Sequence, residues 1–165
     1  MKPLSNRQMQ AWAALCVQRY CATRGIRHPD IDALIQHLAS ILVAADLPEW
    51  AAELGRLRIS GLGDPIPSDV LAAVPRRHQE SFHKIVEFAV EVGMSDMFGA
   101  STGEPLRSMN GCRDILSTEF IKAPDLETVA VFDPEPLPWG NPATADAYAQ
   151  FQRKNFTELV EGPSS

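Results

Sequence analysis

The apolar residues near the start of the chain recur at the spacing of an α-helix. Ser5 is suited to cap this helix, because Ser5 and Gln8, three residues later, form a capping-box pattern. Gly25 is suited to end it, since glycine readily adopts the left-handed conformation that follows many helices. A first helix is therefore predicted between these residues. Its inward stripe is expected to contain Met9, Trp12, Ala13, Cys16, Val17 and Tyr20.

The same spacing predicts two more helices before residue 60. Pro29 suits the first turn of a second helix, and Asp30 and Asp32 complement the positive end of its dipole. A third helix is predicted from Pro48, and residues 60–69 then contain the glycines and prolines of a loop. The second helix is expected to bury a stripe of Ile31, Leu34, Ile35, Leu38, Ile41, Leu42 and Ala45.

The middle of the chain predicts a short helix over residues 69–73 and a longer one over residues 75–93. Within the longer one, KIVEFAVEV also fits a strand, because several of its residues are β-branched and they partly alternate. The helical spacing upstream favours the helix. A last core helix is predicted over residues 105–122, and the Asn110-Gly111 pair, which favours turns, can divide it.

The character of the chain changes after Pro124. Residues 127–132, ETVAVF, have the β-propensity and the alternation of a short strand. Four prolines then fall between Pro134 and Pro142, and residues 144–160 fit a terminal helix.

Together these elements predict a mainly α protein. The chain has 165 residues, the usual size of one domain, and 45% of them are hydrophobic, so a core can form without metals or disulfides. We expect a single-domain bundle of five to six helices over residues 1–123. A proline-rich C-terminal arm over residues 124–165, with the short strand and the terminal helix, is expected to pack on the same domain.

Three alternatives compete for the arm: it packs on its own domain, it docks on another chain, or it is a disordered tail. Burial of a ring such as that of Trp139 contributes about 1.5–3 kcal/mol, which favours packing. A proline-rich ligand would instead present stiff backbone to a partner, although the segment lacks a P-x-x-P repeat. We expect the packed arm, with Trp139 substantially buried. On the docking alternative, the partner-binding residues are Pro134, Pro136, Pro138 and Trp139.

The formal net charge of −6 is concentrated in the last third of the chain, since residues 113–165 carry nine acidic and four basic side chains. Nucleic-acid binding needs a basic surface, so no nucleic acid is expected as a partner. The acidic third favours a basic partner protein, or simply keeps the protein in solution. The chain shows no secretory signal and no stretch of about 20 apolar residues that could span a membrane. A cytoplasmic protein without membrane association is expected.

The sequence shows no clear motif for a metal or a cofactor, and neither is expected. Glu80 and His83 form an E-x-x-H pair, but bundle metal sites use two such pairs, and helical geometry places this one opposite the apolar stripe. GASTGEP precedes a helix as a phosphate loop does, yet Glu104 stands where that loop needs lysine. The odd number of cysteines, three, argues against a disulfide framework.

Two functional classes remain. The missing catalytic motifs and the acidic third favour a non-enzymatic interaction or regulatory protein, such as an inhibitor or an immunity-like partner of a basic protein. The alternative is a small-ligand-binding protein, or an enzyme, with a pocket inside the helix bundle. For that alternative, the candidate pocket residues come from one loop and the helix after it: Ser101, Thr102, Arg107 and Cys112.

Overall fold

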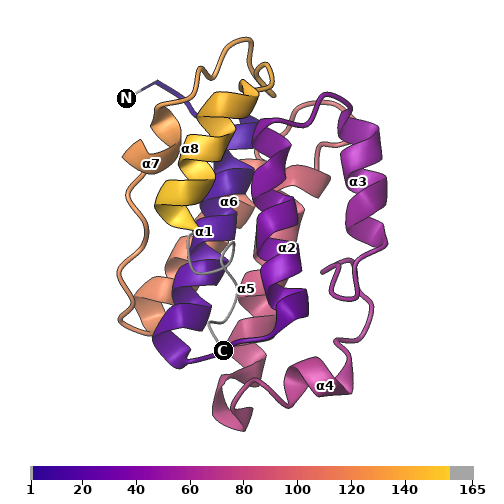
Figure 1. Cartoon of the computed structure of the whole chain (residues 1–165), viewed down its shortest axis with the longest axis vertical. Helices are drawn as coiled ribbons and strands as arrows, with labels where there is room; N and C mark the ends of the chain where they lie inside the picture. The colour runs from indigo at the N-terminus through magenta and orange to yellow at the C-terminus, as the bar shows by residue number, and fades with distance from the viewer. Residues whose placement is uncertain (1, 157–165) are drawn as a thin grey trace.

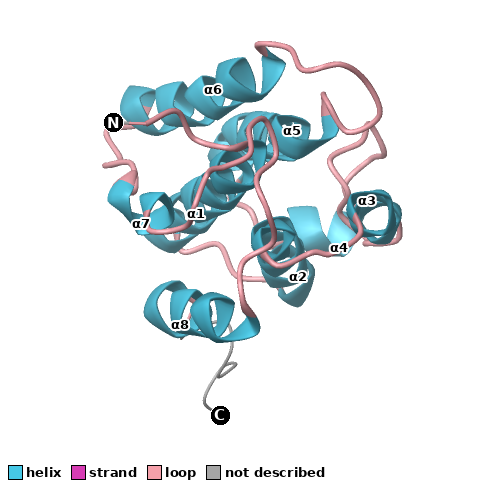
Figure 2. Ribbon diagram, turned by 90° about the horizontal axis from the view of Figure 1, so that it is seen from above, coloured by secondary structure: helices cyan, strands magenta, loops and turns pink. Residues whose placement is uncertain are grey.

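Helix α1 (Asn6–Arg24) forms the centre of the computed structural model, which describes residues 2–156. Figure 2 shows α1 between α5 (Gln79–Met94) and α6 (Glu104–Thr118) on one side, and α2 (Pro29–Ala39) and α8 (Ala145–Asn155) on the other. The described residues form no strand, so the predicted mainly α fold is confirmed. The other elements are α3 (Leu47–Gly55), α4 (Ser68–Leu71), α7 (Glu127–Ala130) and two short 3-10 helices, Ser40–Leu42 and Arg76–His78.

The two ends of α1 form as the sequence predicts. The Ser5 hydroxyl accepts a hydrogen bond from the Gln8 backbone N–H (3.2 Å), and the Gln8 side-chain oxygen accepts one from the Ser5 N–H (2.7 Å). Two otherwise unpaired N–H groups at the helix start are thereby satisfied. At the other end Gly25 is left-handed, with φ 68°, and closes the helix.

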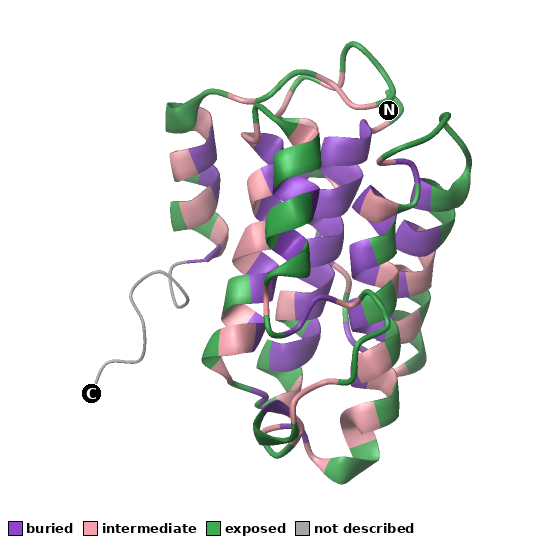
Figure 3. Ribbon diagram, turned by 90° about the vertical axis from the view of Figure 1, so that its right-hand side faces the viewer, coloured by how far each residue is buried: buried purple, intermediate pink, exposed green. Residues whose placement is uncertain are grey.

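The burial of α1 differs from the single inward stripe that the sequence predicts. Fourteen of its nineteen residues are buried, because other elements cover it on several sides. The buried set includes four polar residues near its start: Asn6, Arg7, Gln8 and Gln10. Figure 3 shows the same distribution, with buried residues in the centre of the bundle and exposed residues along its outer faces.

Gln10 illustrates how a polar residue is accommodated in this core. Its side-chain amide donates to the carbonyl of Ala89 (2.7 Å) and accepts from the N–H of Gly93 (2.8 Å). These two groups stand four residues apart in α5, so they are the pair that an α-helix normally bonds together. The Gln10 amide therefore ties α1 directly to the backbone of α5. Gly93 suits this contact, because a Cβ there would overlap the Gln10 oxygen.

Other side chains of α1 bond to backbone carbonyls in the surrounding segments. Arg7 donates to Ile41, Ala44 and Gly140, Gln8 to Val129 and Phe132, Trp12 to Pro124, Gln18 to Asn155, Arg19 to Lys122, and Tyr20 to His78. Most of these carbonyls lie in loops or at helix ends, where no helical N–H is available to them. The central helix thus positions the connections of the fold as well as its core.

Helix α6 ends with an unusual residue. Phe120 follows the helix with φ 59°, a conformation that usually belongs to glycine. The N–H of Phe120 bonds to Ser117 (3.1 Å) and that of Ile121 to Leu116 (2.8 Å), as in the Schellman motif. The side chain of Phe120 is 97% exposed, so the hydrogen bonds of this turn, rather than packing of the ring, end the helix.

The prediction of a strand over residues 127–132 is wrong. Residues 127–130 form α7 instead, with Val129 fully buried. A short strand needs a neighbouring strand for its backbone groups, and the described part of the chain offers none. The Gln8 amide satisfies the carbonyls of Val129 and Phe132 in its place.

Two other expectations concerned breaks and ends of helices. The Asn110-Gly111 pair does not divide α6, and KIVEFAVEV is helical within α5. Gly111 lies directly beneath Phe88 of α5, where a Cβ would come within 2.7 Å of the ring. Close packing of the two helices therefore explains the glycine.

The terminal helix ends at Asn155, and residues 157–160 of its predicted range lie outside the described residues.

Replacement of Gln10 by the nearly isosteric glutamate tests the bond between α1 and α5. At pH 7 Gln10→Glu is expected to lower the free energy of unfolding by about 3 kcal/mol or more, because an unpaired carboxylate would face the Ala89 carbonyl in the core. Burial raises the pKa of such a group above its unfolded value of about 4.3, so the loss should shrink as the pH falls towards 4. Urea denaturation at both pH values measures this.

Gln36→Glu is the matched control, since Gln36 is half-buried on α2 and lines a surface groove. Its effect should stay within about 0.5 kcal/mol at both pH values. Equal destabilisation by the two variants, or a Gln10→Glu loss that does not depend on pH, would contradict the buried amide bridge.

Candidate functional site

The segment between α7 and α8 crosses the N-terminal end of α1 and is bonded to it. The N–H of Asn6 donates to the carbonyl of Pro138 (2.6 Å), and Nε of Arg7 donates to the carbonyl of Gly140 (3.2 Å). Further along, the N–H of Ala143 donates to a carbonyl at the end of the 3-10 helix after α2 (2.7 Å). These bonds hold the backbone of residues 131–144 on the body of the protein.

The four residues that the sequence offers for partner binding divide into two kinds. Trp139 and Pro134 are half-buried, and Trp139 packs against the hydrophobic core. Pro136 and Pro138 are exposed, and the peptide bonds before both are cis. The ring of Trp139 is therefore only partly available to a partner. The solvent-exposed side of the segment consists of its other residues.

The exposed residues of this region are acidic and apolar. Residues 125–137, called the acidic strip below, carry four exposed carboxylates, from Asp125, Glu127, Asp133 and Glu135. Two exposed apolar side chains stand among them, Val131 (77% exposed) and Leu137 (42% exposed).

No basic residue offsets the acidic strip within its own part of the sequence. Lysine, arginine and histidine are absent from residues 123–152. Among the described residues, none of the four carboxylates of the strip forms an ion pair.

Elsewhere in the described chain six carboxylates have a basic partner. Glu119 pairs with Arg24 (2.8 Å), and Glu80 pairs with Lys84 (3.1 Å) along α5. The second of these pairs occupies the carboxylate of the E-x-x-H motif on the outer face of that helix. Exposed carboxylates such as Glu53 and Glu87 also lack an ion pair among the described residues, so what distinguishes the acidic strip is the absence of basic residues from its part of the sequence.

The four candidate pocket residues differ in their environment. Ser101, Thr102 and Arg107 are exposed, whereas Cys112 is fully buried between α5 and α6. Thr102 is bound to the buried Asp96, through its hydroxyl (2.5 Å) and its N–H (2.8 Å), and this fixes the loop before α6. Three grooves on the described surface, of about 160, 610 and 910 Å³, are all lined by other residues.

One polar cluster contains the residue types of a hydrolase without their geometry. His78, Ser81 and Glu119 line the groove of about 610 Å³ beside α5 and α6. The hydroxyl of Ser81 is bonded to the phenol of Tyr20 (2.9 Å), and Nδ1 of His78 lies 4.0 Å from a Glu119 oxygen. A nucleophilic serine needs a base in hydrogen-bond contact, and a tyrosine hydroxyl with a raised pKa, caused by burial, is a poor base at neutral pH. The cluster therefore supports a structural role.

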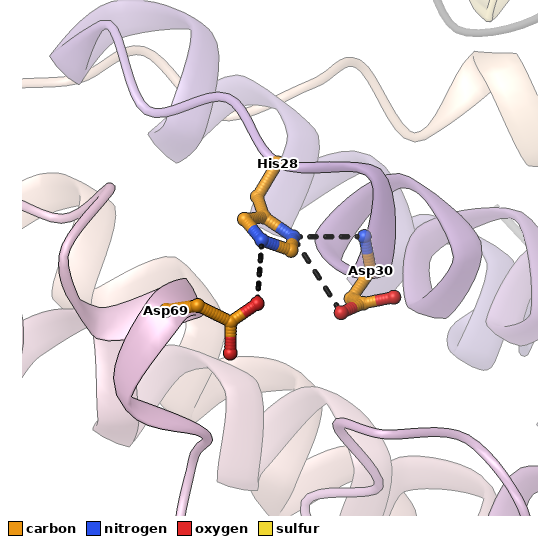
Figure 4. Close-up of side chains that lie close together, drawn as sticks. All are labelled: His28, Asp30 and Asp69. Atoms are coloured by element: carbon orange, nitrogen blue, oxygen red, sulfur yellow. Dashed lines mark hydrogen bonds and ion pairs between the residues drawn. The ribbon is translucent and has the colours of Figure 1, made fainter.

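A second cluster has the residue types of a metal site. Figure 4 shows His28, at the start of α2, between Asp30 and Asp69, with Nε2 of His28 3.3 Å from an Asp69 oxygen. Arg58 already bridges both carboxylates, at 2.6 Å from Asp30 and 2.8 Å from Asp69. Its guanidinium lowers the pKa of Asp69 to about 2. The cluster is thus a salt-bridge network that joins α2 to α4, with arginine as its cation.

The three cysteines are all buried and free. Burial raises the pKa of the Cys16 and Cys112 thiols, and it raises the pKa of Cys21 to about 12. The nearby carboxylate of Asp32 adds to the shift at Cys21. Because the thiolate is the reactive form, these side chains behave as small apolar residues at neutral pH.

Comparison of the chain with protein-family models, with curated proteins and with solved structures finds no match. None of the helices in the described part is long and apolar enough to cross a membrane.

Part of the acidic strip is readable in the sequence. The absence of basic residues between Lys122 and Arg153 is visible without a structure, and it is a sharper signal than the charge of the whole last third. The exposure of Val131 and Leu137 is not readable, because an apolar residue beside a helix is usually expected to face the core. Only the path of the backbone over α1 shows which side chains stay outside.

Thiol chemistry tests the environment of the cysteines. At pH 8 all three should react with dithionitrobenzoate far more slowly in the folded protein than in the denatured chain. For Cys21, a rise of the pKa from 9.0 to about 12 lowers the thiolate fraction by about 1,000-fold. The reference is the same protein in guanidinium chloride, where three thiols should react at once. A cysteine that reacts at the denatured rate in the folded protein would contradict its burial.

Proposed function

We propose that the protein is a non-enzymatic interaction protein that binds a basic partner protein through the acidic strip. The observation that carries this proposal is the group of four exposed carboxylates that form no ion pair among the described residues, with two exposed apolar side chains on the same segment. An inhibitor, or an immunity-like protein that neutralises a basic target, would use such a surface.

The charge of the strip supports a basic partner. Four carboxylates between residues 125 and 137, with no basic residue among them, make a negative surface that attracts a positive one. Such complementarity raises the rate of association and selects against acidic partners.

The apolar residues support a protein partner rather than a small cation. Val131 and Leu137 are large and exposed, and association with a partner would remove their side chains from water. Interfaces commonly place apolar side chains at the centre of a polar rim. The strip contains both apolar and charged side chains within thirteen consecutive residues.

The bonds between the segment and α1 support binding without a folding step. Asn6 and Arg7 hold the carbonyls of Pro138 and Gly140, and the Gln8 amide holds that of Phe132. A surface that is ordered before it meets its partner loses less conformational entropy on binding. The half-buried Trp139 serves this order, because it packs on the core on the inner side of the segment.

The environment of the candidate nucleophiles supports a non-catalytic protein. Ser81 is bonded to Tyr20 rather than to an imidazole, and the cysteine thiols have raised pKa values. Both arrangements oppose the activated nucleophile that covalent catalysis requires.

Charge reversal within the strip tests the proposal. Affinity capture from native lysate should return a stoichiometric basic protein. With the double variant Glu127→Lys and Glu135→Lys, the affinity for that purified partner should fall at least tenfold, because two attractive charges become repulsive. The wild-type affinity should also fall as salt is raised to about 0.5 M, since salt screens exposed charges. Titration calorimetry measures both effects.

The matched control is the double variant Glu53→Lys and Glu87→Lys, which makes the same charge change at two exposed positions on α3 and α5. It should keep the affinity within about twofold of wild type, apart from the non-specific effect of net charge. Equal loss in both variants would argue against the strip as the binding surface. The proposal is also overturned if no stoichiometric partner is captured while the purified protein converts a metabolite.

A further inference from the structure

The groove of about 910 Å³ lies where α1, α2 and α8 meet. In Figure 1 α8 and α2 lie to the left and right of α1, and in the view from above in Figure 2 both lie on the same side of it. Its volume falls in the range of about 300–1,000 Å³ that is typical of small-molecule sites. The residues that line it come from all three helices and from the segments that precede α2 and α7.

The inner surface of this groove is mainly apolar. Leu15 of α1, Ile26 before α2 and Ile35 of α2 line it and are buried. Ala22 and Ala33 line it from the facing helices and are exposed, so the side chains that could fill the space are short. The apolar surface that the described residues leave exposed in the groove is therefore that of Ala22 and Ala33, above the buried larger side chains.

The rim of the groove is basic. Arg19, Arg27 and Lys154 line it, and Asp32 is its single carboxylate. Among the described residues Lys154 forms no ion pair, and it is exposed. This balance is opposite to that of the whole chain, whose formal net charge is −6.

The basic side chains act on the interior of the groove. Burial raises the pKa of Asp32, and the positive charges of Arg27 and His28 act in the opposite direction. Burial still outweighs these two charges at Asp32, so an anion in the groove needs a direct basic partner, such as Lys154.

Hydrogen bonds fix the geometry of the rim. Nη1 of Arg19 donates to the carbonyl of Lys122 (2.8 Å), and the Gln18 amide donates to the carbonyl of Asn155 (2.7 Å), which joins α1 to the end of α8. The rim is thus largely formed before any ligand is present, as small-molecule sites usually are.

We propose that the groove between α1, α2 and α8 is a binding site for an amphipathic monoanion, a carboxylate with an apolar chain or ring. The apolar part would lie against Ala22 and Ala33. The carboxylate would face Lys154 and Arg19. This site and the acidic strip share one lining residue, Thr128 of α7, and none of the four carboxylates of the strip lines the groove.

Three probes with the same eight-carbon chain separate charge from apolar contact: octanoate, octan-1-ol and octyltrimethylammonium. Octanoate should bind at least tenfold more tightly than the other two in titration calorimetry. In a ¹⁵N–¹H spectrum it should shift the amide signals of Ala22, Ala33 and Thr128. Equal affinity for octanoate and octan-1-ol, or shifts confined to other parts of the molecule, would overturn the proposal.

Two variants locate the interaction. Lys154→Glu should weaken octanoate binding at least tenfold and leave octan-1-ol binding within twofold. Ala33→Trp should abolish binding of both, because the ring fills the groove. Arg76→Glu, a charge reversal at an exposed position outside the lining residues, is the matched control and should change nothing. Octanoate affinity that stays within twofold of wild type in Lys154→Glu would contradict the carboxylate site. Circular dichroism confirms that each variant is folded.

Discussion

The fold depends on hydrogen bonds that side chains of the central helix α1 donate to backbone carbonyls around it. An all-helical protein with long connections has many carbonyls at helix ends and in loops that lack an N–H partner, and leaving them unpaired in a core is unfavourable. Arg7, Gln8, Trp12 and Tyr20 donate to carbonyls in five different segments, at residues 41–44, 78, 124, 129–132 and 140. The polar residues of α1 therefore replace the pairing that a neighbouring strand gives in a sheet.

Both proposed binding surfaces follow from this arrangement. The start of α1 fixes the segment that carries the acidic strip, because Arg7 and Gln8 hold Gly140 and Phe132 there. The end of α1 supplies one wall of the basic groove, and Gln18 joins that wall to α8. The two proposed surfaces have opposite charge, so they would attract different kinds of ligand.

The sequence predicts the elements of this fold better than their environments. Capping residues and apolar spacing are local signals, so the start of α1 at Ser5 and its end at Gly25 could be read directly. The burial of Gln10 could not, because it depends on α5, which lies some eighty residues away in sequence. The same limit applies to residues 127–132, which form the short helix α7 and a turn, because no second strand exists for them among the described residues. The charge of the acidic strip can be predicted from the sequence, whereas the path of its backbone across α1 cannot.

Native-state hydrogen exchange, followed with increasing denaturant, tests most directly whether α1 holds the fold together. If it does, the backbone amides of residues 12–17 exchange only through global unfolding, with the free energy and the denaturant dependence of the whole molecule. The N–H groups of Asn6 and Ala143 are then also protected, because their partners are held in place. Exchange of the α1 amides through a local opening, at a much smaller free energy and while α5 and α6 stay closed, would contradict the account.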